Sequence, residues 1–219
     1  MRLITLALTA AGLLCAQSRM VDLKGVASWT QTQVKVAPVE YAGKKGVSIA
    51  RTPEAKGENS FALVPGIEFQ DGTIEVELAG KPGAGAGGEA RGFIGLVFRV
   101  QAGGSKYESF YIRPTNGRAE DQVRRNHSSQ YVSFPDFPWP KLRKETPEKY
   151  EAYVDLEPGV WTKVKVEVAG EKARLFVHGA TQPTLIVNDL KHGVSKGGVG
   201  IWVGPGTEGH FTNVRVESR

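Results

Sequence analysis

The stretch Trp161-Thr-Lys-Val-Lys-Val-Glu-Val-Ala169 alternates apolar and charged residues along most of its length. Because side chains of a β-strand point alternately to opposite faces, its three valines would point inward. Lys163, Lys165 and Glu167 would then point to solvent. The stretch therefore predicts a strand with one buried face and one solvated face, as antiparallel sheets commonly have.

Eleven further segments outward from this stretch also read as strands, and clusters of Gly, Pro, Asn or Asp separate them. They are 33–41, 46–51, 60–64, 72–79, 92–101, 106–113, 149–156, 172–178, 184–190, 197–203 and 209–217. No window keeps a helical period for three turns. The chain of 219 residues contains 27 glycines and 12 prolines, which suit many turns. We expect an all-β fold, a two-sheet antiparallel β-sandwich of the jelly-roll type, as a single domain over residues 17–219.

The first 16 residues have the pattern of a secretory signal peptide. Met1 and Arg2 precede a run of apolar or small residues that ends at Ala16 and is too short to span a bilayer. We expect cleavage after Ala16, a secreted or periplasmic protein and no membrane span. A lipoprotein anchored at Cys15 is the alternative. Cleavage after Ala16 would remove Cys15, the single cysteine, so we expect no disulfide and no thiol nucleophile.

The net charge and the spacing of possible metal ligands indicate which partners and cofactors to expect. The formal net charge is +5, yet 28 basic residues face 23 acidic ones and no long run of like charge occurs, so we expect no nucleic-acid partner. The four histidines lack the close spacing of metal ligands, and no acid-rich calcium loop is present. We expect no cofactor and assign no metal ligand; a single structural calcium stays open.

Four of the expected strands carry aromatic rings on their polar face. If 92–101, 106–113, 149–156 and 197–203 share a sheet, these residues form one surface: Arg99, Tyr107, Tyr111, Arg113, Glu151, Tyr153, Asp155 and Trp202. Gly95, Gly198 and Gly200 would leave space there for a ligand to approach the backbone. Sugars stack on rings and bond to charged groups, so the surface predicts a carbohydrate ligand. An ordinary solvated sheet face is the alternative.

A long connection, residues 114–148, is crowded with polar and aromatic side chains, and long connections inside compact domains are often functional. Here we expect further substrate-binding residues: Asn116, Arg118, Arg124, Arg125, Asn126, Tyr131 and Trp139. His127 is the candidate general acid or base, with Asp121 or Asp136 orienting it. Glu151 is the third catalytic candidate beside His127 and Asp121. Its pairing with Asp155 as two glycosidase carboxylates is disfavoured, because their Cα atoms would lie about 13 Å apart. A surface loop held by Arg-Asp pairs is the alternative.

The segment 159–170, in which Trp161 opens a strand, and the following Ala173-Arg-Leu-Phe-Val-His-Gly179 resemble a pattern of laminin-G-like and other concanavalin A-like jelly rolls. In those domains the second strand ends in Asn-Gly, and here His178 replaces the asparagine. Phe69-Gln-Asp-Gly-Thr-Ile-Glu-Val-Glu77 and Gly197-Gly-Val-Gly-Ile-Trp-Val203 fit as well. Together the motifs resemble the bacterial 3-keto-disaccharide hydrolase-like domains.

That resemblance implies a secreted jelly roll that acts on or binds carbohydrate with its concave sheet. The first hypothesis is a glycoside hydrolase-like domain acting on an oligosaccharide or 3-keto sugar. The alternatives are a non-catalytic, lectin-like module and a laminin-G-like interaction module, because a fold does not determine a function. Arg113, Arg118, Arg124 and Arg125 concentrate basic charge beside the expected surface, which suits sugar hydroxyls or an acidic glycan.

Overall fold

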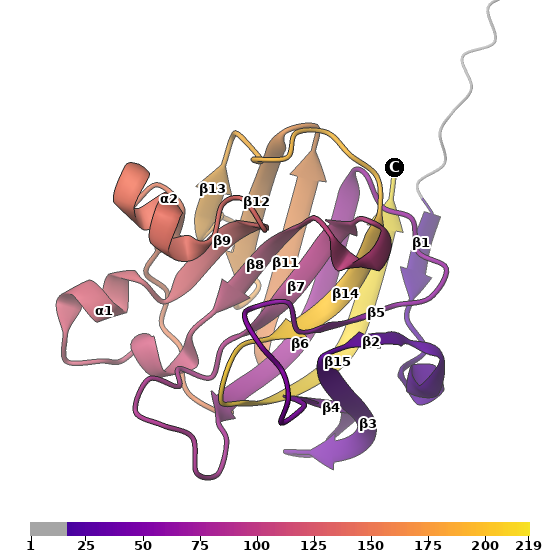
Figure 1. Cartoon of the computed structure of the whole chain (residues 1–219), viewed down its shortest axis with the longest axis horizontal. Helices are drawn as coiled ribbons and strands as arrows, with labels where there is room; N and C mark the ends of the chain where they lie inside the picture. The colour runs from indigo at the N-terminus through magenta and orange to yellow at the C-terminus, as the bar shows by residue number, and fades with distance from the viewer. Residues whose placement is uncertain (1–16) are drawn as a thin grey trace, which may run out of the picture.

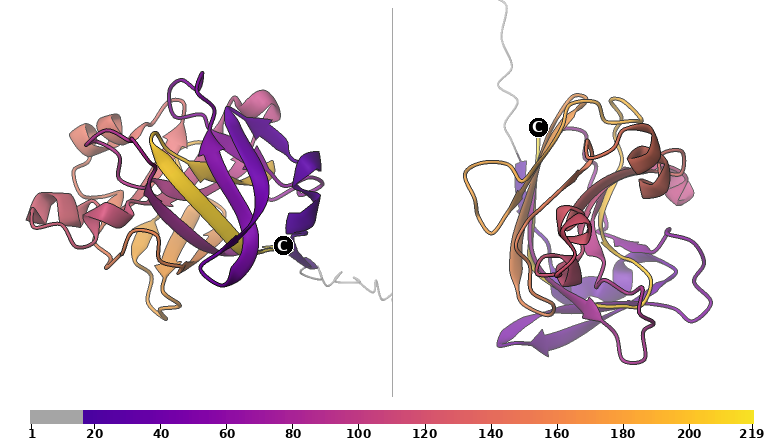
Figure 2. Two further views of the ribbon diagram at one scale, coloured as in Figure 1. Left: turned by 90° about the horizontal axis from the view of Figure 1, so that it is seen from below. Right: turned by 90° about the vertical axis from the view of Figure 1, so that its left-hand side faces the viewer.

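The computed structural model describes residues 17–219, which form two antiparallel sheets packed face to face (Figures 1 and 2). Sheet A runs in the order β13 (Leu185–Val187), β12 (Lys172–Val177), β11 (Thr162–Ala169), β6 (Gly72–Pro82), β15 (Thr207–Ser218), β4 (Lys44–Arg51) and β3 (Val34–Tyr41), and β1 (Gln17–Met20) pairs with β15. Sheet B runs β10 (Glu151–Ala152), β9 (Ser129–Phe134), β8 (Tyr107–Ile112), β7 (Ile94–Val100), β14 (Gly198–Val203), β5 (Phe61–Leu63) and β2 (Thr30–Thr32). The expected signal peptide, residues 1–16, lies outside the described residues.

The helices are short and connect strands. They are α1 (Gln122–Asn126), α2 (Trp139–Glu145) and three 3₁₀ turns: η1 (Leu23–Ser28), η2 (Ala102–Gly104) and η3 (Pro114–Asn116). In Figure 1, α1 and α2 lie at the left-hand side of the molecule, near β9. Among residues 17–219, no helix combines the length and apolar character that a membrane crossing needs.

The structure confirms the two-sheet antiparallel sandwich, and each of the twelve expected strands is present. Three strands were missed: β1, β2 and β9. The expectation of a connection without strands over residues 114–148 is therefore wrong, because Ser129–Phe134 forms β9 and pairs with β8. The expected strand 149–156 is reduced to Glu151–Ala152.

The core lies between the sheets, where the alternating apolar residues meet. Val164, Val166 and Val168 of β11 are buried as the opening stretch predicted. From sheet B, the aliphatic faces of β7, β8 and β14 pack against them in one hydrophobic cluster, which contains Leu96, Phe110 and Ile201 among others. Each buried side chain of this size contributes about 1.5 to 3 kcal/mol through removal of apolar area from water.

A β-bulge near the end of β7 interrupts the alternation. Val97 pairs with Gly200 and Val100 with Gly198, so two residues of β7 oppose a single residue of β14. Arg99 has a positive φ of 53° there. Because a bulge adds one residue to one strand, the faces exchange after it. Val100 joins the cluster on the outer face of sheet B, and Arg99 turns away from that face.

The prediction that Arg99 binds substrate on the aromatic surface is therefore corrected. Arg99 is 1% exposed, and its guanidinium donates to the carbonyl oxygens of Gln70 at 2.9 Å, Gly193 at 2.8 Å and Gly170 at 2.7 Å. It also pairs with Asp71 at 3.1 Å. The side chain ties three loops together at one end of the sandwich.

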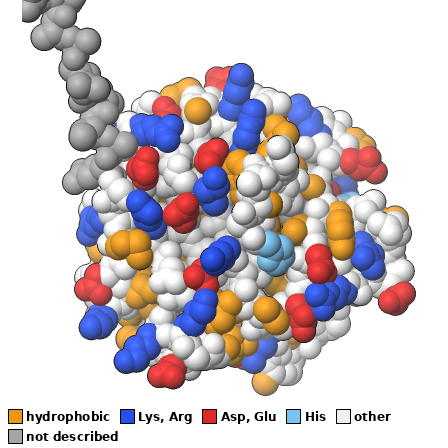
Figure 3. Space-filling view, turned by 180° about the vertical axis from the view of Figure 1, so that it is seen from behind, with side chains coloured by type: hydrophobic (Ala, Val, Ile, Leu, Met, Phe, Trp, Pro, Cys, Tyr) orange, Lys and Arg blue, Asp and Glu red, His pale blue; other side chains and the backbone are white. Residues whose placement is uncertain are grey.

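The outer face of sheet A is an ordinary solvated surface. Figure 3 shows the molecule from behind, where basic and acidic side chains alternate. Ion pairs such as Lys165 with Glu167 and Lys44 with Glu77 lie on this sheet. Cross-strand and same-strand pairs of this kind are expected of a solvated sheet face.

Candidate functional site

Two adjoining hollows form one groove over the outer face of sheet B. The aromatic end has a volume of about 370 Å³ and the charged end of about 360 Å³. Both are lined by Glu89, Phe93 and Trp139, which lie where the two ends meet. The aromatic end is further lined by Glu58, Gly87, Ala90, Tyr111, Trp202, Pro205 and Gly206. The charged end is further lined by Arg91, Arg113, Asn116, Asp121, Val123, Arg124, His127 and Arg143.

Strand register places Tyr111 of β8 and Trp202 of β14 on opposite sides of Gly95, the residue of β7 that pairs with both. The two rings lie 4.9 Å apart between centroids and are tilted by 31°. The predicted shared face of Tyr107, Tyr111 and Trp202 is present. These rings pack with Phe61, Val97, Val100 and Val132 in a second hydrophobic cluster.

The expected exposure of this aromatic face is not seen. Tyr111 is 3% exposed and Trp202 is 4% exposed, so both form the floor of the groove and not an open platform. The partly exposed rings that line the groove are Phe93, just before β7, and Trp139, the first residue of α2. A ligand would therefore stack on Phe93 or Trp139 and contact the floor only at its edges.

Gly95 and Gly200 of this face serve the packing of the protein itself. A Cβ at Gly95 would lie 2.6 Å from the Cβ of Tyr111, and one at Gly200 would lie 3.0 Å from a methyl of Leu63. The interpretation that they leave room for a ligand is therefore replaced. They let neighbouring strands and the floor rings come together, as glycine in a strand often does where another chain segment approaches closely.

Glu58 lines the aromatic end and was missed in the sequence. Its carbonyl oxygen accepts hydrogen bonds from Nε1 of Trp202 at 2.8 Å and from the hydroxyl of Tyr107 at 3.4 Å, which fixes the segment before β5 over the ring floor. Burial raises the pKa of the Glu58 carboxyl, and a hydrogen bond to Trp139 and the charge of Arg113 oppose this rise. Only the fold brings this acid beside those rings.

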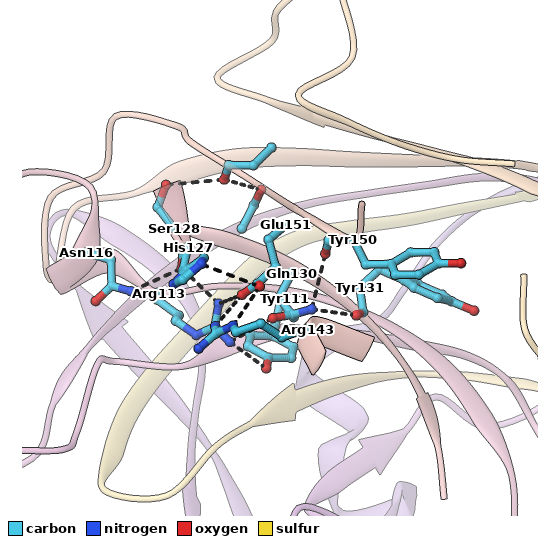
Figure 4. A network of polar contacts seen from close by, with 12 residues as sticks. Tyr111, Arg113, Asn116, His127, Ser128, Gln130, Tyr131, Arg143, Tyr150 and Glu151 are labelled. Carbon is cyan, nitrogen blue, oxygen red and sulfur yellow. Dashed lines mark hydrogen bonds and ion pairs between the residues drawn. The ribbon is translucent and has the colours of Figure 1, made fainter. Parts of the chain in front are cut away.

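The charged end is organised around the carboxylate of Glu151 (Figure 4). Its side chain is 3% exposed and lies among three basic groups. Arg143 of α2 donates from Nε to Oε2 at 2.8 Å and from Nη2 to Oε1. Arg113 donates to Oε1 at 3.4 Å, and Nε2 of His127 lies 3.7 Å from Oε2. Charge-assisted hydrogen bonds hold this carboxylate in one orientation.

Arg113 links the two ends of the groove. Its Nη2 donates to the hydroxyl of Tyr111 at 3.1 Å and to Oε1 of Gln130 at 2.9 Å. Its Nη1 donates to the carbonyl oxygen of His127 at 2.8 Å as well as to Glu151. With both terminal nitrogens of its buried guanidinium hydrogen-bonded, Arg113 is suited to positioning its neighbours. Burial is the main cause that raises the pKa of Tyr111, so this hydroxyl stays protonated.

His127 lies beside the groove with the chemistry of a base. Burial lowers its pKa, the charge of Glu151 opposes the shift, and Arg143 and Arg113 reinforce it. The imidazole is therefore neutral near pH 7 and able to accept a proton. The only carboxylate paired with it in residues 17–219 is that of Glu151.

The expectation that Asp121 or Asp136 orients His127 is thereby corrected. Oδ1 of Asp121 accepts from the backbone amide of Arg124 at 2.9 Å and caps the N-terminus of α1. Oδ2 of Asp136 lies 3.0 Å from Nε2 of His192, a different histidine. Asp121 still lines the charged end, but its capping bond gives it a structural task.

Asn116 and Arg124, two of the residues predicted to bind substrate, lie together at the charged end. Nε of Arg124 donates to Oδ1 of Asn116 at 2.9 Å, and Nη2 donates to Oγ1 of Thr115 at 3.0 Å. Nδ2 of Asn116 donates to the carbonyl oxygen of His127 at 3.0 Å. Through these bonds, η3 holds both α1 and the histidine against the groove.

Several predicted binding residues lie outside the groove. Arg118 is exposed and pairs with Asp155 at 2.9 Å and Glu157 at 2.7 Å. Arg125 lies 5.3 Å from the ring centre of Tyr153, and Asn126 accepts a bond from Gln122 within α1. None of these residues lines either end of the groove in the described part of the chain.

Tyr131 needs a different correction, because it faces the core. Its hydroxyl donates to Oε2 of Glu108 at 2.6 Å and accepts from the backbone amide of Lys191 at 2.8 Å. Its neighbour Gln130 faces the groove side and bonds Arg113. In a strand, adjacent residues point to opposite faces, and the missed strand β9 is the reason for this error.

Within residues 17–219, no three His, Cys, Asp or Glu side chains lie close enough together to hold a metal ion. The residues that gather at the groove are instead arginines, aromatic rings, one histidine, Asp121 and three glutamates, Glu58, Glu89 and Glu151, a set suited to hydrogen bonding, stacking and proton transfer.

Comparison with solved structures shows the same sandwich in proteins of low sequence identity. A carbohydrate-binding module, CBM66, from Bacillus subtilis has a TM-score of 0.56 at 16% identity, over 85% of this chain and 96% of that one. A Bacillus subtilis protein of unknown function with a galectin-like fold has a TM-score of 0.53 at 12% identity, over 93% and 98%. The Crh5 transglycosylase in complex with NAG has a TM-score of 0.53 at 15% identity, over 92% and 84%.

At the level of sequence alone, no family model and no curated protein matches this chain. The structural likeness at 12 to 16% identity therefore shows the fold and nothing finer. The chain shares the jelly-roll sandwich of galectin-like proteins and of the CBM66 module.

Proposed function

We propose that this protein binds a carbohydrate in the groove on the outer face of sheet B. The observation that carries the proposal is the indole of Trp139, partly exposed at the junction of the two ends. A pyranose face stacks on such a ring while its hydroxyls bond to charged groups at the ring's margin. Glu58 on one side and Arg143 and His127 on the other supply those groups.

The indole is held ready for stacking. The guanidinium of Arg143 lies 4.5 Å from the ring centre of Trp139, and the same guanidinium is fixed by Glu151. A ring whose position is set before binding loses little conformational entropy when a ligand arrives. The groove is thus preorganised along the chain of contacts from Glu151 through Arg143 to Trp139.

The structural neighbours support this proposal by analogy. One of them is named as a carbohydrate-binding module, and another is a transglycosylase bound to a sugar. Secretion through the expected signal peptide, residues 1–16, belongs to the same proposal. So does membership among the 3-keto-disaccharide hydrolase-like domains, which the motifs around Trp161 suggest.

The test is binding to a panel of oligosaccharides, measured by isothermal titration calorimetry with the wild type, Trp139→Ala and Tyr153→Ala. Tyr153 is the matched control, because it is 45% exposed and stacks with Arg125 outside the groove. We expect Trp139→Ala to weaken binding at least tenfold and Tyr153→Ala to leave it unchanged. Equal binding by wild type and Trp139→Ala would place the ligand elsewhere.

Hydrolysis of a glycosidic bond is the second candidate, and the carboxyl of Glu58 favours it. A half-buried acid with a raised pKa is the kind of group that protonates a leaving oxygen. In this scheme Glu58 donates its proton to the glycosidic oxygen as the C–O bond breaks. Water adds its oxygen to the anomeric carbon, and His127 takes the proton that the water loses.

The two candidates separate in one assay. The protein is incubated with ordinary and 3-keto disaccharides, and release of monosaccharide is measured by chromatography. Hydrolysis predicts release by the wild type and a loss of at least a hundredfold in the rate of release by Glu58→Gln. Binding without release, by contrast, identifies a lectin-like module.

A further inference from the structure

Four arginines surround the charged end of the groove: Arg91, Arg113, Arg124 and Arg143. Arg91 pairs with Glu89, whose side chain is 99% exposed. Arg113 and Arg143 share a single carboxylate, that of Glu151 (Figure 4). Within residues 17–219, Arg124 makes no ion pair. Positive charge therefore exceeds the negative charge that the protein itself supplies there.

Neutral acceptors hold Arg124 in place. Its Nε and Nη2 donate to Oδ1 of Asn116 and to the carbonyl and hydroxyl oxygens of Thr115, at 2.9 to 3.3 Å. In the described part of the chain, nothing accepts a hydrogen bond from its Nη1. The guanidinium is thus oriented by one edge, and the other edge is left for a ligand.

The surroundings of Arg124 disfavour a bare cation. Burial and the nearby charge of Arg91 lower its pKa, and the charges of Asp121 and Glu89 offset this in part. Neither acid takes up the guanidinium, because Asp121 caps α1 and Glu89 pairs with Arg91. A bound anion would relieve the repulsion between Arg91 and Arg124.

Arg143 lines the same hollow and, like Arg124, has a terminal nitrogen with no acceptor in the described residues. Its Nε and Nη2 are used by Glu151, and among residues 17–219 no acceptor for its Nη1 is present. Two guanidinium groups with free donors, from α1 and α2, therefore line one hollow next to the ring of Trp139. Guanidinium donors suit the planar oxygens of a carboxylate and the oxygens of a sulfate.

We propose that the glycan bound in this groove carries an anionic group, the carboxylate of a uronic acid or a sulfate ester, which Arg124 and Arg143 hold at the charged end. The inference rests on the proposed function and specifies the class of its ligand. The sugar ring next to the anionic group stacks on Trp139, and Glu58 bonds hydroxyls at the aromatic end.

The test compares ligands that differ only in charge. The probes are oligosaccharides of galacturonic, glucuronic and mannuronic acid, each beside its methyl ester, and a sulfated galactan oligosaccharide beside its desulfated form. Titration calorimetry in low salt and in 0.15 M salt measures the preference. A hydrogen bond to a charged group is worth about 1.5 to 3 kcal/mol, so we expect the anionic form to bind at least tenfold more tightly.

Two variants locate the effect. Arg124→Gln keeps an amide near Asn116 but removes the charge, and it should sharply reduce the preference for the anionic form. Arg125→Gln, one residue along α1 and outside the groove, is the matched control and should keep the preference. The uronate arm and the sulfate arm tell the two anionic groups apart.

The outcomes distinguish this inference from the function it rests on. Neutral ligands that bind as tightly as anionic ones, with binding still lost in Trp139→Ala, overturn the anionic ligand and leave the carbohydrate groove standing. A preference for the anionic form that Arg124→Gln retains overturns the role of Arg124. Binding of no probe, charged or neutral, overturns both proposals.

Discussion

Nε of Arg143 donates to Oε2 of Glu151 at 2.8 Å at the charged end of the groove. The same guanidinium lies over the indole of Trp139. The acid therefore neutralises part of the arginine charge and also sets the position of the stacking ring. A change at Glu151 should be felt in stability and in ligand binding together.

Replacing Glu151 with Ala should be strongly destabilising. Arg113 is buried, and without Glu151 its charge has no carboxylate partner in the described structure. Removal of one partner from a buried ion pair costs about 3 to 5 kcal/mol. Urea unfolding should show a loss of this size in the free energy of unfolding. Glu157→Ala, which removes an exposed partner of Arg118, is the control and should leave that free energy unchanged.

Replacing Arg99 with Met tests the correction at the bulge. The variant removes the ion pair with Asp71 and leaves the carbonyl oxygens of Gln70, Gly170 and Gly193 without the guanidinium that donates to them. We expect a loss of at least about 3 kcal/mol in the free energy of unfolding. Ligand affinity per folded molecule should not change, because Arg99 does not line the groove. A normal melting curve combined with lost binding would return Arg99 to the ligand surface.

Arg99 shows where the alternation of side chains along a strand stops predicting which face a residue is on. The inner and outer sets of β8 and β14 follow from period-two alternation alone, and so does the burial of Val164 and its neighbours in β11. Arg99 breaks the rule because it lies in a bulge. A bulge arises from the pairing of two strands, and the sequence of one strand alone does not reveal that pairing.

The sequence predicted groove residues only where they cluster in one segment of the chain. His127, Arg113, Asn116, Arg124 and Trp139 fall in or beside a polar, ring-rich connection, and they line the groove. Glu58 comes from a segment of ordinary turn composition, and the pairing of β14 with β5 brings it there. Tyr131 was misplaced because β9 was read as part of a loop, and a missed strand leaves the faces of its residues unassigned.

Trp139 and Trp202 should respond differently to truncation. Trp202 is buried in the second hydrophobic cluster, and a change from Trp to Ala in such a site costs about 3 to 5 kcal/mol. Trp139 is partly exposed at the start of α2, so its loss should cost less than about 2 kcal/mol. Thermal and urea unfolding of the two variants measure the difference. Equal losses would show that Trp139 is part of the packed floor.

His127 should make the protein less stable in mild acid. Burial lowers its pKa below the ordinary value near 6.5, so the unfolded chain binds the proton more readily than the folded one. Stability is therefore fully present above about pH 6.5 and falls as the pH drops through that value. His127→Gln should show a smaller loss of melting temperature between pH 7.5 and pH 5. Burial also lowers the pKa of His210. A variant that combines His127→Gln with His210→Gln should therefore show a still smaller fall in melting temperature over the same pH range.

Glu58 should trade stability for function. Burial raises its pKa above the ordinary value, so the folded protein holds the proton more tightly than the unfolded chain does, and stability falls as the pH rises through the raised pKa. Glu58→Gln removes the half-buried charge but keeps the size of the side chain. We expect the variant to gain melting temperature over the wild type at pH 8 and to match it at pH 4.

The same variant should weaken ligand binding or turnover at every pH, because Glu58 faces the rings that receive the sugar. A gain in stability at pH 8 with binding and turnover unchanged would show that Glu58 has no role in ligand binding or catalysis. Glu54→Gln, four residues earlier and exposed, is the matched control and should change neither property. A gain in stability paired with lost function is the pattern expected of a polar group kept in an unfavourable place for its ligand.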